Sequence, residues 1–221
     1  MAQHLQRDVE TLKKALMDIS VMVEDAINKA ILALVDRRTE LARDVMHGDN
    51  EIDQKEVMIE EECLKILALH QPVAADLRFI IVVLKVSNDL ERMGDLAVNI
   101  TERAAYLSTH PPLQVELDFP LMAEKVRMMV RESLTSLINR DTELAREVLA
   151  KDDDIDDLNR DMFVSLQDLM RSDTNTVERA VHSLSASRHL ERIADLATNI
   201  AEDVVFMVEG ELIRHRVEDY T

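Results

Sequence analysis

The chain has 221 residues, of which 44 are acidic and 26 are basic, so its formal net charge is −18. This charge repels phosphate backbones and anionic headgroups, which argues against nucleic acid as a partner. Apolar residues make up 47% of the chain, while three Gly and four Pro leave little turn chemistry. The composition therefore predicts an all-α protein.

The first half is expected to contain three helices. Apolar residues recur in steps of four and three from Leu5 to Ala30, which predicts one long helix packed at a shallow angle against its neighbours. A second helix is expected over residues 39–69, and an interruption at Gly48-Asp49 is left open because Gly ends helices and Asp begins them. His70-Gln71-Pro72 is typical of a turn, with Pro72 at the first position of a third helix that runs to about residue 107.

The second half is expected to repeat this plan. Pro111, Pro112 and Pro120 lie close together in the sequence and predict a linker. Helical periodicity resumes at Met122, residues 171–174 form a second capping turn, and a last helix is expected over about 175–208, with Gly210 as its stop.

An internal duplication relates the two halves. Residues 39–53 align with 142–156 at 9 of 15 positions, and residues 89–102 align with 189–202 at 9 of 14. Two matches in the same order indicate a repeated structural unit. We expect two tandem three-helix bundles, at residues 1–109 and 121–221, joined by a Pro-rich linker at 110–120.

Four pairs of carboxylates recur at a spacing of four residues, which places both members of a pair on one helix face. They are Asp49 with Asp53, Glu91 with Asp95, Asp152 with Asp156, and Glu191 with Asp195. The midpoint between Asp53 and Glu91 falls at Pro72, so an antiparallel hairpin turning there brings the first two pairs level, and the second hairpin does the same near Asp173.

Carboxylates at the same height repel one another, and each like-charged pair costs about 0.2–0.5 kcal/mol. A positive group is therefore expected among them. One candidate is a divalent or iron-type metal ion, since oxygen ligands suit hard cations. Asp89 and its repeat counterpart His189 are further candidate ligands. The alternative is a ladder of ion pairs to Arg92, Arg192 and Lys85, and the sequence leaves both open.

Enzyme motifs are missing from the sequence. It contains no Glu-x-x-His, which argues against a ferritin-like di-iron oxidase, and no phosphate-binding glycine loop or nucleophile elbow. We therefore expect no catalytic residue. A carboxylate-rich metal enzyme and a metal-independent helical scaffold remain the alternative functions.

The cellular location follows from two features of the sequence. Cys63 is the only cysteine, so it cannot form an intramolecular disulfide. No segment approaches about 18 uncharged apolar residues, and the first ten residues lack an apolar signal core. We expect a cytoplasmic protein without direct membrane insertion.

The chain resembles the PhoU family of bacterial accessory proteins for phosphate-specific transport. The resemblance rests on Gln71-Pro72-Val73-Ala74-Ala75-Asp76-Leu77-Arg78 and on the segment from Asp89 to Asp95 with its repeat from His189 to Asp195. It implies metal binding at the E(D)-x-x-x-D motifs, and a partner surface around Pro72, Asp76 and Arg78 in the first half only.

The same resemblance implies a function. Family members act as negative regulators of the phosphate-starvation response. They connect the ATPase subunit of the phosphate ABC transporter to a sensor histidine kinase, and they often form homodimers. These are expectations for a non-enzymatic adaptor that modulates phosphate uptake.

Overall fold

The computed structural model describes residues 2–211 and 213, and the secondary structure found there is entirely helical. The elements in chain order are α1 (Ala2–Val35), η1 (Thr39–Leu41), α2 (Ala42–His70), α3 (Ala74–Ser108), α4 (Phe119–Asn139), α5 (Thr142–Leu149), α6 (Asp152–Ser172), η2 (Thr174–Thr176) and α7 (Val177–Glu209). The all-α prediction is confirmed.

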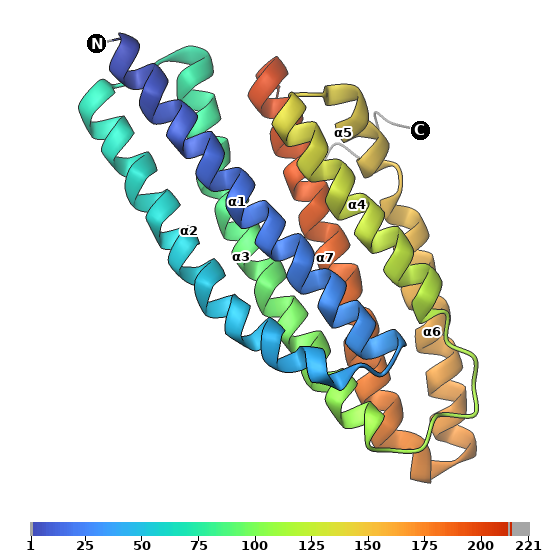
Figure 1. The fold of residues 1–221 in the computed structure, drawn as a ribbon. Coiled ribbons are helices and arrows are strands. Elements are labelled where there is room, and N and C mark those ends of the chain that lie inside the picture. The colour runs from blue at the N-terminus through green and yellow to red at the C-terminus, as the bar shows by residue number, and fades with distance from the viewer. Residues whose placement is uncertain (1, 212, 214–221) are drawn as a thin grey trace.

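Two three-helix bundles lie side by side. Helices α1, α2 and α3 form the first bundle, and α4, α5 with α6, and α7 form the second (Figure 1). Helix α3 packs along α7, so the third helix of each repeat forms the centre of the molecule. The predicted pair of internally duplicated bundles is confirmed.

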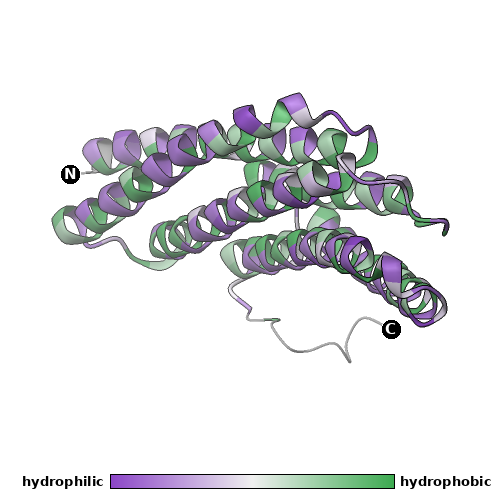
Figure 2. Ribbon diagram, turned by 90° about the horizontal axis from the view of Figure 1, so that it is seen from below, coloured by the Kyte–Doolittle hydropathy of each residue, from purple (hydrophilic) through white to green (hydrophobic). Residues whose placement is uncertain are grey.

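The cores follow from the apolar stripes in the sequence. On α1, Leu12, Leu16, Ile19 and Val23 are buried, as the steps of four and three require. Burying each such side chain contributes about 1.5–3 kcal/mol. Figure 2 shows polar and apolar residues alternating around the helices, the amphipathic pattern of elements that pack on one side.

In the first hairpin, the structure answers one question that the sequence left open and corrects one prediction. Helix α2 runs through Gly48 without a break, because one helical Gly costs only about 1 kcal/mol against Ala. The break occurs in the second repeat, where three aspartates open α6 and stabilise the positive end of the helix. The placement of Pro72 at the first helical position is wrong: Val73 is the extended N-cap, and α3 begins at Ala74.

The predicted helix stops in the second half are confirmed. Asp173 accepts a hydrogen bond from the Asn175 backbone N–H at 3.0 Å and so caps η2. Gly210 ends α7 with a left-handed φ of 80°, and its N–H donates to the Phe206 carbonyl. A side chain at this φ would be strained, so glycine suits the position.

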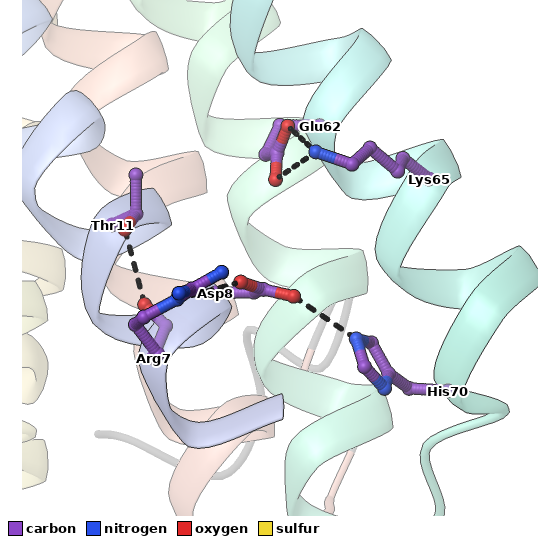
Figure 3. A network of polar contacts seen from close by, with 6 residues as sticks. All are labelled: Arg7, Asp8, Thr11, Glu62, Lys65 and His70. Atoms are coloured by element: carbon purple, nitrogen blue, oxygen red, sulfur yellow. Dashed lines mark hydrogen bonds and ion pairs between the residues drawn. The ribbon is translucent and has the colours of Figure 1, made fainter. Parts of the chain in front are cut away.

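A polar network closes the end of the first bundle near the α2–α3 turn. His70 Nε2 lies 3.0 Å from Asp8 Oδ2 and links the last residue of α2 to α1 (Figure 3). This hydrogen bond lowers the pKa of the Asp8 carboxyl below its usual value. Lys65 pairs with Glu62 one turn earlier on α2.

The linker is held by aromatic rings and by an arginine. The ring of Tyr106 stacks between His110 and His182, with centroids 4.0 and 3.7 Å away. Arg179 on α7 donates from Nη1 to the Pro111 carbonyl at 2.9 Å. These contacts fix the chain between the two bundles against α7.

Among the helices that the structure describes, none is long and apolar enough to cross a membrane.

Candidate functional site

The first acidic cluster lies between α2 and α3. Asp49 and Glu91 are half-buried, whereas Asp53 and Asp95 are exposed. Electrostatic coupling of Asp49 to Asp95, and of Glu91 to Asp53, places the two pairs close together across the hairpin. The level arrangement expected from the turn at Pro72 is therefore present in the fold.

Gly94 makes room for this cluster. A Cβ atom at Gly94 would lie 3.1 Å from Asp49 Oδ1 and 3.3 Å from Ile52 Cδ1. Both contacts are tighter than ordinary van der Waals distance, so the missing side chain lets α2 and the Asp49 carboxylate approach α3. This role was not apparent in the sequence, where the only signal is the change from Gly94 to Ala194 between the repeats.

The second acidic cluster lies between α6 and α7. Asp152 and Glu191 are half-buried, and Asp156 and Asp195 are exposed, which repeats the exposure pattern of the first cluster. Asp152 is coupled electrostatically to Asp195, Asp156 and Glu191. The break before α6 therefore leaves the pairing of the carboxylates intact.

Burial and mutual repulsion shift several of these carboxyl groups toward the protonated form. Burial, followed by the charges of neighbouring aspartates, raises the pKa of Asp49 and of Asp152 to about 6. The pKa values of Glu91, Glu191 and Asp195 are raised by the same two causes. At neutral pH the clusters carry repulsion that a bound cation would relieve.

The alternative of an ion-pair ladder is not realised at these positions. In the described part of the chain, none of the eight carboxylates lies within 4.0 Å of a lysine or arginine nitrogen. Lys85 pairs instead with Asp203 on the other bundle, and Arg92 approaches Asp89 at 4.0 Å. Asp49 Oδ1 and Glu191 Oε2 are buried without a hydrogen-bond partner, one in each cluster.

The donor set fits a hard cation in its chemistry. Each cluster offers only carboxylate oxygens, and each holds one buried oxygen with an unused lone pair. Across the residues that the structure describes, no group of three His, Cys, Asp or Glu side chains converges closely enough to hold an ion as it stands. A cation would therefore have to draw the side chains together by rotation about their χ angles.

A cavity of about 380 Å³ lies between the two motifs, where α3 and α7 pack against each other. Its lining consists of four pairs of repeat-equivalent residues: Arg92 and Arg192, Asp95 and Asp195, Leu96 and Leu196, and Asn99 and Asn199. The cavity thus lies on the pseudo-twofold axis of the duplication. The asparagines were missed by the sequence reasoning, although both belong to the repeated motif.

The further candidate ligands lie in unlike surroundings. Asp89 is 7% exposed and approaches Arg92. His189 is half-buried, its Nε2 is 3.2 Å from Ser185 Oγ, and its Nδ1 is buried without a partner. Burial, with the charge of Arg103, lowers the pKa of His189.

The residues expected to form a partner surface differ in their exposure to solvent. Pro72 is buried and Asp76 is exposed. Arg78 donates from Nε to the Met207 carbonyl at 3.3 Å and packs beside Gly210. Arg78 therefore holds the end of α7 against α3, an internal role that the sequence did not suggest.

Comparison with known proteins assigns the family. The family model described as the PhoU domain matches residues 16–104 and 119–204. The chain belongs to the PhoU family.

Relatives named phosphate-specific transport system accessory protein PhoU homolog match nearly the whole chain. The homologue of Aquifex aeolicus is 42% identical over 96% of both chains, and that of Deinococcus radiodurans is 33% identical over 95% of this chain and 99% of its own. The crystal structure of PhoU from Pseudomonas aeruginosa superposes with a TM-score of 0.91 at 35% identity, covering 93% of this chain and 99% of that one.

Proposed function

We propose that the chain is a non-enzymatic, cytoplasmic accessory protein of a phosphate-specific transport system. The observation that carries the proposal is the match over 96% of both chains to a relative named for this role. The duplicated bundles and the paired motifs belong to the matched region.

In this function the chain is a regulatory adaptor. It binds the ATPase subunit of the phosphate ABC transporter and a phosphate-responsive sensor histidine kinase, and it represses the phosphate-starvation response when phosphate is plentiful. The net charge of −18 disfavours direct contact with DNA, so control of transcription passes through the kinase. Two copies form a homodimer.

The two acidic clusters supply cation sites. Glu91 and Asp95 with Asp49 and Asp53 form the first, and the second consists of Glu191 and Asp195 with Asp152 and Asp156. A bound cation supplies positive charge that neutralises the cluster. The carboxylates orient it, while the half-buried members, whose pKa values are raised, release protons as it binds.

A reporter of phosphate-starvation genes tests the regulatory function. Deleting the gene should raise reporter expression in phosphate-rich medium, and restoring the wild-type chain should repress it. Purified ATPase subunit and the cytoplasmic part of the kinase should each bind the purified chain. An unchanged reporter together with no binding to either protein would disprove the proposal.

Elemental analysis tests the cation sites separately. The wild-type chain should carry metal that a chelator removes, with a lower melting temperature afterwards, because a ligand of the native state raises its stability. Glu91→Gln/Asp95→Asn should lose the metal of the first cluster and retain that of the second. Full metal content in this variant would refute the assignment of its two residues.

A further inference from the structure

A pocket with an apolar floor opens beside the turn between α4 and α5. It has a volume of about 240 Å³ and is lined by residues of α1, the start of α3 and the end of α4. Leu16, Phe79 and Leu137 form its buried floor, and Met17 and Ile138 are 47% and 52% exposed. We call it the Phe79 pocket.

The rim of the Phe79 pocket is cationic. Lys13, Lys14 and Arg140 line it together with a single carboxylate, Glu10. Glu10 pairs with Lys13 at 2.7 Å, whereas neither Lys14 nor Arg140 has an ion pair within 4.0 Å in the described part of the chain. The pocket is therefore locally positive on a chain whose net charge is −18.

Two of the cations are held in place by the aromatic floor. Lys13 Nζ lies 5.9 Å from the centroid of the Phe79 ring, and Arg140 Cζ lies 5.8 Å from it. Arg140 also occupies the left-handed C-cap of α4, with φ 56°. Cation–π attraction and this fixed backbone limit the freedom of the guanidinium before any partner arrives, which reduces the entropy lost on binding.

We propose that the Phe79 pocket is the docking site for an acidic segment of a partner protein. The segment places one large apolar side chain over Phe79 and sets its carboxylates against Lys14 and Arg140. Charge complementarity selects this occupant, because an acidic segment is repelled by the rest of the surface and attracted here. The proposal rests on the proposed function, which supplies the partner.

The exposed apolar residues support a protein occupant. Met17 and Ile138 border the cavity from different helices, so they would exclude water around a buried anchor side chain. An apolar centre with a polar rim is the usual anatomy of a protein–protein interface. The small volume suits a single anchor side chain rather than a large cofactor.

The test measures binding to two purified proteins, the transporter ATPase subunit and the cytoplasmic part of the sensor kinase. Lys14→Glu/Arg140→Asn reverses one charge and removes another, and Asn tolerates the left-handed backbone at position 140. The matched control, Arg43→Asn/Arg171→Glu, makes the same change of charge at exposed positions in the first turn of α2 and the last turn of α6.

The expected result is that at least one protein binds the pocket variant about tenfold or more weakly, while the control binds like the wild type. Hydrogen exchange on the wild-type complex should show protection of residues 13–17 and 137–141, a readout that needs no variant. Equal binding by the pocket variant, without such protection, would overturn the docking site and leave the proposed function standing.

Two other outcomes also overturn it. If neither protein binds the wild-type chain, the proposed function fails along with the docking site. Light scattering would reveal an interface between copies of this chain if the pocket variant changed the molecular mass and left both affinities unaltered.

Discussion

The ammonium of Lys85 on α3 lies 2.5 Å from the carboxylate of Asp203 on α7, and the Asp203 side chain is 1% exposed. The pair joins the two bundles across the interface between α3 and α7. The offset of 100 residues makes Ser185 and Arg103 its repeat counterparts, and there Ser185 contacts His189 instead. The helices α3 and α7 at the central interface are thus related by pseudo-symmetry, but the ion pair between them has no equivalent in the other repeat.

Replacing Lys85 by Met should destabilise the chain. The buried Asp203 carboxylate would lose the Lys85 ammonium, and removing one partner of a buried ion pair is costly. Because Lys85 itself is 34% exposed, we expect a loss of about 2 kcal/mol in the free energy of unfolding rather than the larger cost of a fully buried pair. Urea denaturation measures it.

Lys65→Met is the control for this prediction. Lys65 is 56% exposed and pairs with Glu62 on its own helix, so its loss should cost no more than about 1 kcal/mol. The double variant Lys85→Met/Asp203→Leu should recover part of the stability, because it also removes the buried carboxylate. Equal effects of Lys85→Met and Lys65→Met would contradict the prediction.

The acidic clusters should make stability depend on pH. The pKa of Asp49 and that of Asp152 are raised to about 6 in the fold, above the usual 3.8. The folded chain therefore holds these protons more tightly than the unfolded chain. This stabilisation is complete below pH 3.8 and is lost as pH rises through about 6.

The variant Asp49→Asn/Asp152→Asn isolates this effect, because Asn resembles the protonated carboxyl. In chelator at pH 8 it should be more stable than the wild type by on the order of 1 kcal/mol, since solvent screens these half-exposed charges. The gap should close as pH falls toward 4. Burial also lowers the pKa of His182 and of His189, which changes stability with pH in the opposite direction. The wild type and the variant share this effect, so it cancels in their difference. A stability difference that does not change with pH would show that the acidic clusters are not its cause.

The sequence was sufficient for the helices and the repeat, since apolar periodicity and turn residues are local signals. It also predicted that Asp49 and Glu91 lie at the same height on neighbouring helices, because the height of residues in a helical hairpin follows from the position of its turn. It did not predict that Lys85 pairs across the bundles, as the sequence contains no signal for how two repeats pack. For the same reason the Phe79 pocket, whose floor and cationic rim come from three helices, was not predicted.

Removing the Tyr106 ring should release the linker. Tyr106 stacks on His110 from the linker and on His182 from α7, and each aromatic pair contributes about 0.5–1.5 kcal/mol. Tyr106→Leu should therefore speed cleavage after Glu116 by the glutamate-specific protease on the order of tenfold. The exposed substitution His47→Leu should leave the rate unchanged. A wild-type cleavage rate in Tyr106→Leu would show that other contacts fix the linker.

Gly94→Ala should distinguish the two acidic clusters. The added methyl group would lie 3.1 Å from Asp49 Oδ1 and displace the carboxylate, while Ala in a helix gains up to about 1 kcal/mol over Gly. The fold should therefore persist, with cation affinity at the first cluster lowered on the order of tenfold, as when a group that positions a ligand is disturbed. Titration calorimetry with Mn²⁺ measures the cation affinity. The control is Ala194→Gly at the repeat-equivalent position. This variant should lose about 1 kcal/mol of stability but bind the cation as tightly as the wild type. Unchanged affinity in Gly94→Ala would mean that Asp49 does not contact the cation, and the first cluster would then consist of Asp53, Glu91 and Asp95.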